Sequence, residues 1–185
     1  QNAKKMRLKR GGQVYKIPGV GLDTEKFKPL SSEERERKRR ELGIGKEDFF
    51  LVSVGELNEN KNQEVILKAL LRMRHRKKNL EHIRYGICGD GFFANRIRED
   101  IRRWCLQDTV TMYGYCRNVW EILGCADISV FPSRREGLGM AGLESLAMGV
   151  PVLASDNRGT REYMRQGENG WVCSWNDVSG FCEGL

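Results

Sequence analysis

The sequence is poor in the residues that build metal sites and disulfide frameworks. Its 185 residues include only two histidines, His75 and His82, and no two cysteines form a C-x-x-C pair. Because neither histidine has a neighbouring set of ligand residues, we expect no metal site. Most of the six cysteines lie inside apolar stretches, which favours reduced, buried thiols in a cytosolic protein.

Long apolar segments are also missing. No run approaches the roughly 20 apolar residues that a membrane-spanning helix needs, and no signal segment opens the chain. Hydrophobic residues make up 39% of the sequence and charged residues 31%, which is typical of a globular protein. A chain of 185 residues allows one domain with a hydrophobic core.

The formal net charge is +7, and much of it comes from two basic runs at residues 35–40 and 72–78. Both runs fall on predicted helices and are interleaved with acidic or apolar residues, so we interpret them as solvated helix faces. Contact with an anionic membrane surface remains an alternative. Nucleic acid is the weakest interpretation, because no RNP-type aromatic signature or zinc finger accompanies the charge.

Short apolar runs alternate with longer segments of helical periodicity. The strands are expected at 14–17, 49–54, 83–88, 110–113, 128–131, 151–154 and 170–173. The first helix is expected to begin at a capping box formed by Ser31 and Glu34. Further helices are expected at 65–73, 93–104, 119–123, 143–148 and 161–165. This alternation predicts an α/β fold, a Rossmann-like parallel sheet flanked by helices.

In such sheets, ligands bind beyond the carboxyl ends of the strands. The loop after 128–131 contains Gly137 and Gly139, whose amides can approach a ligand closely, and a helix begins just after them. A helix N-terminus attracts phosphate. Glu144, on the first turns of that helix, would repel phosphate but can accept hydrogen bonds from ribose hydroxyls.

The loops after two other strands carry further candidates. Lys61, in the loop after 49–54, offers a point charge to a diphosphate. Gly89 and Gly91, after 83–88, allow a tight turn near a ligand, and we expect Asp90 between them to cap the following helix. Position 94 is alanine, so no third glycine completes the dinucleotide motif of an oxidoreductase.

Glu136 and Glu144 are separated by seven residues, and this spacing resembles the E-x7-E motif of family 4 retaining glycosyltransferases with the GT-B fold. Other segments resemble the same family in the same order: P-S-x-x-E-G-x-G at 132–139, E-S-x-A-x-G-x-P-V at 144–152, G-x-N-G at 167–170, V-G-L-D-x-x-x-F at 20–27, and V-G-x-L at 54–57 followed by Lys61. The resemblance covers about residues 17–177, nearly the whole chain.

The resemblance implies a role for each matching residue. Glu144 would hold the ribose, Glu136 would contact the donor sugar near the reacting centre, and Lys61 would bind the diphosphate and stabilise it as it departs. The wider donor site would comprise Gly137, Leu138, Gly139, Met140, Glu56, Gly89, Gly91, Asn118 and Val119. The loop 115–119 would hold the base mainly through backbone groups. Enzymes of this fold commonly work without a metal, which agrees with the missing D-x-D motif.

One position departs from the family. Glu56 stands where the family often has an arginine that contacts phosphate, although some bacterial polysaccharide enzymes also have glutamate there. Glu56 could pair with Lys61 or Arg134, or contact the sugar. Arg134 or Arg135 could replace the lost cation.

The resemblance implies one half of a GT-B enzyme, with residues 1–12 as a linker from a missing acceptor domain and 13–185 as a donor domain truncated at its C-terminal helix. We expect a UDP- or GDP-sugar donor, retaining hexosyl transfer to a hydroxyl in polysaccharide or glycolipid synthesis, and no turnover by this chain alone. The expected location is cytoplasmic, and peripheral contact with the cytoplasmic face of the membrane is an alternative. The rivals are an epimerase or phosphorylase relative and a non-catalytic nucleotide-sugar-binding scaffold.

Overall fold

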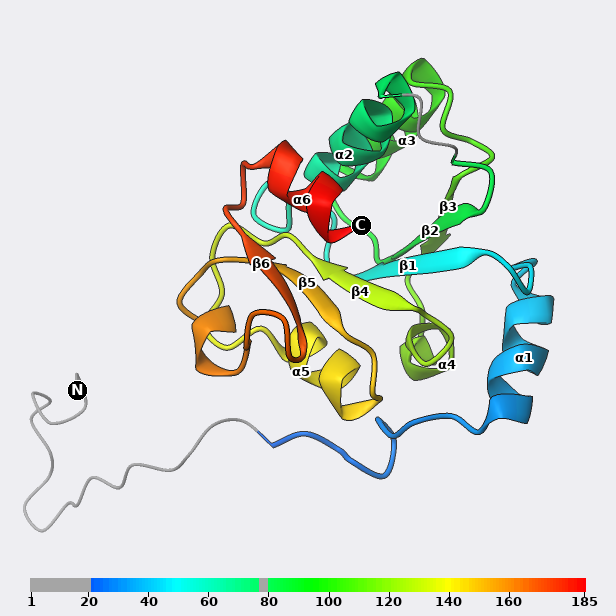
Figure 1. Ribbon diagram of the computed structural model, residues 1–185, viewed down its shortest axis with the longest axis vertical. Helices are drawn as coiled ribbons and strands as arrows, with labels where there is room; N and C mark the ends of the chain where they lie inside the picture. Colours follow the sequence, from blue (N-terminus) through cyan, green and yellow to red (C-terminus); the bar gives the residue numbers. More distant parts are fainter. Residues whose placement is uncertain (1–20, 77–79) are drawn as a thin grey trace, which may run out of the picture.

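The computed structural model describes residues 21–76 and 80–185, which form a three-layer α/β/α domain (Figure 1). The strands are β1 (Phe49–Val54), β2 (Ile83–Cys88), β3 (Val110–Gly114), β4 (Ile128–Phe131), β5 (Val152–Ser155) and β6 (Gly170–Cys173). The helices are α1 (Ser32–Glu41), α2 (Glu64–His75), α3 (Ala94–Arg103), α4 (Val119–Leu123), α5 (Met140–Ala147) and α6 (Val178–Gly184). The expected linker 1–12 and strand 14–17 lie outside the described residues.

All six strands are parallel and follow the order β3-β2-β1-β4-β5-β6. Helices α2, α3 and α6 cover one face of the sheet, and α1, α4 and α5 cover the other (Figure 1). Strand residues alternate between the two cores, so Leu51 faces α2 while Phe50 and Val52 pack toward α4. Burial on both faces explains why these strands are continuous apolar runs in the sequence. The predicted Rossmann-like parallel sheet is confirmed.

One predicted helix is wrong. Residues 161–165 were expected to be helical, but the structure has a 3₁₀ turn at Thr160–Glu162. The Asn157 side chain accepts hydrogen bonds from the amides of Gly159 and Thr160 at 3.0 and 3.1 Å, which starts the turn. The Arg165 amide then donates to the Asn169 side chain at 2.8 Å, so the helical ladder cannot continue.

Helix α1 has no apolar residue in its sequence, SEERERKRRE, yet it packs against the sheet. The expected capping box is present, since Ser31 and Glu34 exchange hydrogen bonds at 3.2 and 2.9 Å. Such a polar helix needs fixed polar contacts to hold it in place.

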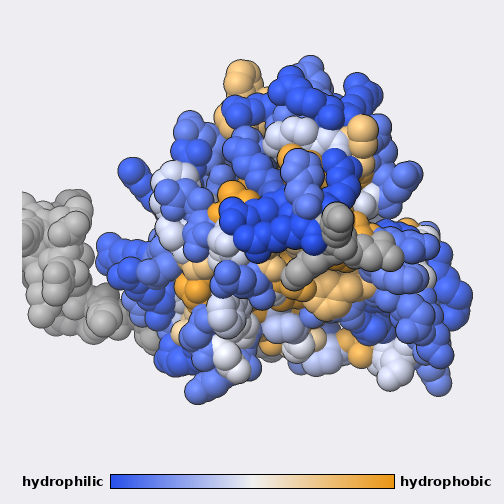
Figure 2. All heavy atoms as spheres, turned by 45° about the horizontal axis from the view of Figure 1, so that its top comes forward, coloured by the Kyte–Doolittle hydropathy of each residue, from blue (hydrophilic) through white to orange (hydrophobic). Residues whose placement is uncertain are grey.

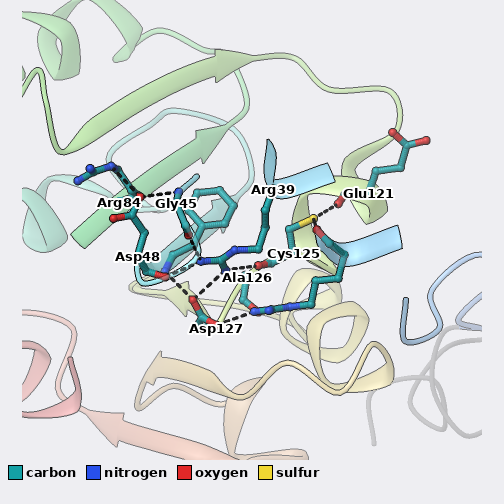
Figure 3. Close-up of polar contacts among 10 residues, drawn as sticks. Arg39, Gly45, Asp48, Arg84, Glu121, Cys125, Ala126 and Asp127 are labelled. Atoms are coloured by element: carbon teal, nitrogen blue, oxygen red, sulfur yellow. Dashed lines mark hydrogen bonds and ion pairs between the residues drawn. The ribbon is translucent and has the colours of Figure 1, made fainter. Parts of the chain in front are cut away.

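Those contacts come from Arg39, whose side chain is only 7% exposed. Its guanidinium donates to the carbonyls of Cys125, Gly45 and Asp48 and to the Asp127 carboxylate (Figure 3). Asp127 in turn accepts a hydrogen bond from the Phe50 amide of β1 at 2.7 Å. The interpretation of residues 35–40 as a purely solvated face is therefore wrong for Arg39, because its charge fastens α1 to the ends of two central strands.

The surface outside these contacts is mostly polar. Figure 2 shows that hydrophilic residues cover most of the face it presents. Within residues 21–76 and 80–185, no helix is both long enough and apolar enough to pass through a bilayer. In the second basic run, Arg72 and Arg76 are exposed, and positions 77 and 78 lie outside the described residues.

We predict that Arg39→Met lowers the free energy of unfolding by about 3 kcal/mol, because it leaves a partly buried carboxylate and buried carbonyls without their donor. Urea unfolding followed by circular dichroism measures this loss. Arg40→Met is the matched control, since Arg40 lies on the same helix, is exposed and pairs with Glu36 at 3.8 Å. We expect a change within roughly 0.5 kcal/mol for the control, and equal losses in the two variants would contradict the anchoring role of Arg39.

Candidate functional site

The loops that follow the central pair of strands diverge at the carboxyl edge of the sheet, and we call the place where they part the crevice. β1 and β4 are hydrogen-bonded neighbours, but β1 continues to α2 on one face and β4 continues to α5 on the other. The point where the chain diverges in this way is where open α/β sheets bind ligands. Asn60 ties the two diverging loops together: its carbonyl accepts from the Arg134 amide at 2.8 Å, and its side chain exchanges two hydrogen bonds with the Arg135 backbone, at 3.0 and 3.1 Å.

Lys61 and Glu136 meet across this crevice. The Lys61 ammonium lies 2.6 Å from the Glu136 carboxylate, although the residues are 75 positions apart. Their side chains are 24% and 14% exposed, so the pair is largely withdrawn from water. The Lys61 side chain passes over Gly55, where an added Cβ would lie 3.4 Å from its Cε atom. A diphosphate that reached Lys61 would have to compete with Glu136 for it.

The glycine loop fixes the start of α5. Gly139 precedes the helix with a φ of +82°, a left-handed conformation that favours glycine. A Cβ there would lie 2.8 Å from the Phe131 ring. The amides at the start of α5 therefore begin at the carboxyl end of β4, as the sequence predicted.

Tyr163 is a positioning residue that the sequence analysis missed. Its hydroxyl donates to the Gly139 carbonyl at 3.2 Å and closes the space beside Gly142, where a Cβ would lie 2.2 Å from the hydroxyl oxygen. Burial raises the pKa of Tyr163, and the neighbouring Glu136 charge raises it further, so the hydroxyl stays protonated and remains a donor. No motif marks this tyrosine, which lies in the segment wrongly expected to be a helix.

A hollow of about 360 Å³ lies at the ends of β1, β2 and β3. It is lined by Val54, Gly55, Glu56, Cys88, Gly89, Asp90, Tyr115, Cys116 and Val119. We call it the acidic hollow, because its walls, drawn from the described residues, include two carboxylates and no lysine or arginine. Like charges repel, so this space is unsuited to phosphate and suited to a neutral group that donates hydrogen bonds.

The acidic hollow contains three of the predicted donor-site residues, Glu56, Gly89 and Val119. Gly91 lies against it, since a Cβ at Gly91 would contact Glu56 at 3.1 Å. Asn118 borders a separate surface hollow beside α4. The glycine-loop residues 137–140 and both glutamates of the E-x7-E spacing lie outside the walls of the acidic hollow.

Glu144 lies in the middle of α5 and is half-buried. Burial raises its pKa, and the positive charge of Lys26 partly offsets that rise. Lys26 belongs to the segment before α1, and its ammonium lies 4.0 Å from the centre of the Trp120 ring on α4. A half-buried carboxylate that forms no salt bridge within residues 21–76 and 80–185 can accept hydrogen bonds from hydroxyl groups.

The structure corrects the expected contacts of two acidic residues. Lys61 pairs with Glu136 and Arg134 pairs with Glu59, so Glu56 pairs with neither. Within residues 21–76 and 80–185, the Glu56 carboxylate has no hydrogen-bond or ion-pair partner. Asp90 accepts a hydrogen bond from the adjacent Gly91 amide at 2.8 Å and does not cap α3, whose N-cap residue is Phe93.

The expectation of buried thiols holds only in part. None of the six cysteines forms a disulfide, but Cys105 is exposed and does not fit the expectation of buried thiols. Across residues 21–76 and 80–185, no three His, Cys, Asp or Glu side chains gather as metal ligands. Catalysis without a metal stays a prediction.

Comparisons with known proteins agree with this architecture. Residues 34–185 match the family model described as glycosyl transferases group 1. The Bacillus subtilis protein EpsD, named as a glycosyltransferase, is 38% identical over 171 residues, covering 92% of this chain and 44% of EpsD.

Two solved structures share the fold. Anabaena HepE in complex with UDP and glucose gives a TM-score of 0.79 at 21% identity, covering 88% of this chain and 44% of HepE. WaaG, described as a glycosyltransferase involved in lipopolysaccharide biosynthesis, gives 0.77 at 21% identity, covering 91% and 45%. The chain thus spans less than half the length of these relatives. It belongs to the group 1 family of glycosyl transferases, and its Rossmann-like sheet is that of a GT-B glycosyltransferase domain.

Proposed function

We propose that the chain is the donor-binding domain of a family 4 retaining glycosyltransferase that uses a UDP- or GDP-sugar. The observation that carries the proposal is the division of charge along the carboxyl edge of the sheet. The acidic hollow suits a nucleoside, whereas Lys61 and the start of α5 suit the diphosphate. HepE, which has the same fold, was solved with UDP and glucose.

In this proposal, the base occupies the acidic hollow beside loop 115–119, and Glu144 accepts hydrogen bonds from the ribose hydroxyls. The diphosphate draws Lys61 away from Glu136, and Glu136 then accepts hydrogen bonds from the donor sugar. The acceptor hydroxyl oxygen bonds to the anomeric carbon as the bond between that carbon and the diphosphate breaks. The diphosphate leaves with the electron pair of the broken bond, and one of its oxygens takes up the hydroxyl proton. Lys61 and the first amides of α5 stabilise the charge that the diphosphate gains. The configuration at the anomeric carbon is retained.

The product would be a polysaccharide or glycolipid, in line with the description of WaaG. We propose a cytoplasmic site of action, with peripheral contact at the membrane face. An acceptor domain would complete the cleft, so this chain alone should bind the nucleotide weakly and transfer no sugar. Transfer of radiolabelled sugar by the isolated chain, at rates typical of glycosyltransferases, would contradict this division of labour.

A non-catalytic binding module is the second candidate, and the unpaired Glu56 in the acidic hollow is the feature that favours it. A panel of UDP- and GDP-sugars separates the two functions. Binding of one donor at micromolar to millimolar concentration supports the donor domain, and no binding of any donor at millimolar concentration supports the scaffold.

We predict that Lys61→Met weakens UDP binding by about 10- to 100-fold, the range expected for loss of a charge-assisted hydrogen bond worth roughly 1.5–3 kcal/mol. Isothermal titration calorimetry measures the change. Lys68→Met is the control, because Lys68 pairs with Glu64 at 2.6 Å on the exposed side of α2. Glu136→Gln should strengthen UDP binding, since Lys61 no longer has to leave a carboxylate. Unchanged UDP affinity in both site variants would contradict the phosphate role of Lys61.

We predict that nucleotide affinity falls on acidification at pH values above 4.5, the ordinary pKa of glutamate. Burial raises the pKa of Glu144, so its carboxylate takes up a proton at a higher pH than an exposed one and can no longer accept from both ribose hydroxyls. Titrations of UDP between neutral and acidic pH measure the effect. Glu144→Gln should remove this part of the pH dependence, and an identical profile in that variant would exclude Glu144 from the ribose contact.

A further inference from the structure

A second hollow, of about 290 Å³, lies between loop 58–64, the start of α3 and Arg134. It shares no wall residue with the acidic hollow. Two of its wall residues are close in the chain to the Lys61–Glu136 pair, since Asn62 follows Lys61 and Arg134 precedes Glu136 by two positions. Its volume is near the lower end of the range for small-molecule sites.

The walls of this hollow contain polar atoms that have no partner. Gln63 is 3% exposed, and its Nε2 donates to the Glu56 carbonyl at 3.2 Å, which leaves Oε1 without a donor. Arg134 Nε is also buried and makes no hydrogen bond. In the described part of the chain, only one other buried side-chain oxygen or nitrogen lacks a partner, Ser133 Oγ. Unpaired buried polar groups are rare in folded proteins, so two of them in one small hollow call for an explanation.

Each charged residue in the walls already has a partner of opposite charge. Arg134 contacts Glu59, and Glu64 contacts both Arg96 at 2.8 Å and Lys68, which is not a wall residue, at 2.6 Å. The walls therefore offer no unpaired cation to an anion such as phosphate and no unpaired carboxylate to a cation. The expected ligand is therefore neutral.

The unpaired atoms further limit the chemical class of the ligand. Gln63 Oε1 needs a donor and Arg134 Nε needs an acceptor, and a hydroxyl group can serve as either. The walls also have apolar parts, since Phe93 and Ile97 line the space. The Trp175 ring is not a wall residue, but the Arg134 guanidinium of the wall lies 4.6 Å from its centre. Several hydroxyls on an apolar ring frame are the chemistry of a sugar.

We propose that this hollow binds a neutral sugar unit of the glycan on which the protein acts, as a carbohydrate subsite separate from the nucleotide. Both unpaired atoms are shielded in the free protein, so the Arg134 side chain, which is 34% exposed, must turn to admit the sugar. As it turns, the Arg134 side chain would release Glu59 and bind a sugar hydroxyl instead. This exchange would place the sugar beside Lys61 and Glu136. The idea depends on the proposed function only for the identity of the glycan.

The test is an NMR titration of the full chain, labelled with nitrogen-15, against millimolar D-glucose, D-galactose and N-acetylglucosamine. At least one sugar should shift the Gln63 side-chain amide and the Phe93 and Arg96 backbone amides. Arg134→Lys keeps the positive charge beside Glu59 and Trp175 but removes the Nε donor, and Gln63→Met removes the unpaired acceptor. Each should weaken sugar binding at least tenfold, while Lys46→Met, an exposed lysine in the loop before β1 and away from the hollow, should not.

Separate titrations of the unchanged chain with UDP and with inorganic phosphate complete the design. UDP binding without any sugar effect overturns this inference and leaves the donor proposal standing. Sugar binding without UDP binding supports the inference while the donor proposal fails. Shifts of the same amides by phosphate but by none of the sugars, or no shift by any ligand, would mean that the hollow holds an anion or ordered water only, and would overturn the inference.

Discussion

β1 and β4 lie side by side at the centre of the sheet, although two strands and three helices separate them in the chain. This pairing determines almost everything at the site. It forces the loops that follow the two strands to diverge toward opposite faces, and it brings Lys61 and Glu136 together from distant parts of the sequence. Arg39 and Asp127 secure the same two strands at their other ends, since Asp127 directly precedes β4 and binds the first core residue of β1, Phe50. Contacts outside the crevice thus fix the two strands that form it.

The carboxyl edge is divided into regions of different electrostatic character. The acidic hollow has two carboxylates, the crevice has one closely matched ion pair, and the hollow beside Arg134 has charges that cancel. A ligand made of chemically different parts, with a nucleoside, a diphosphate and a sugar, matches such a series better than a uniform ligand does. The division also explains why glutamate in place of arginine at position 56 need not abolish nucleotide binding. The Glu56 carboxylate lies in the region expected to hold the nucleoside.

Sequence reasoning was reliable where the physics is local. Six of the seven predicted strands fall within the described residues, and each is confirmed there, because strands buried on both faces of a parallel sheet are continuous apolar runs. Ser31 with Glu34 predicted the start of α1 because the two residues are three positions apart. Sequence reasoning failed where a side chain binds a nearby backbone amide. Asn157 binds the amides of Gly159 and Thr160, which starts a 3₁₀ turn in place of the expected helix, and Asp90 binds the Gly91 amide instead of capping α3. The partners of Lys61 and Arg134 and the role of Tyr163 depend on loop packing, which no spacing in the sequence reveals.

The meeting of Gly55 and Gly89 has a consequence for how such a domain can change over evolution. A Cβ on Gly89 would lie 1.9 Å from the Gly55 carbonyl oxygen, so main chain meets main chain at this point in the wall of the acidic hollow and no side chain fits between. Substitutions cannot reshape that part of the wall without moving two strands of the sheet. Under the proposed function, new donor preferences would arise at the rim, where Tyr115 is 79% exposed and the Glu56 carboxylate has no partner within residues 21–76 and 80–185. A rigid wall with an adjustable rim lets one scaffold acquire many specificities while its core stays the same.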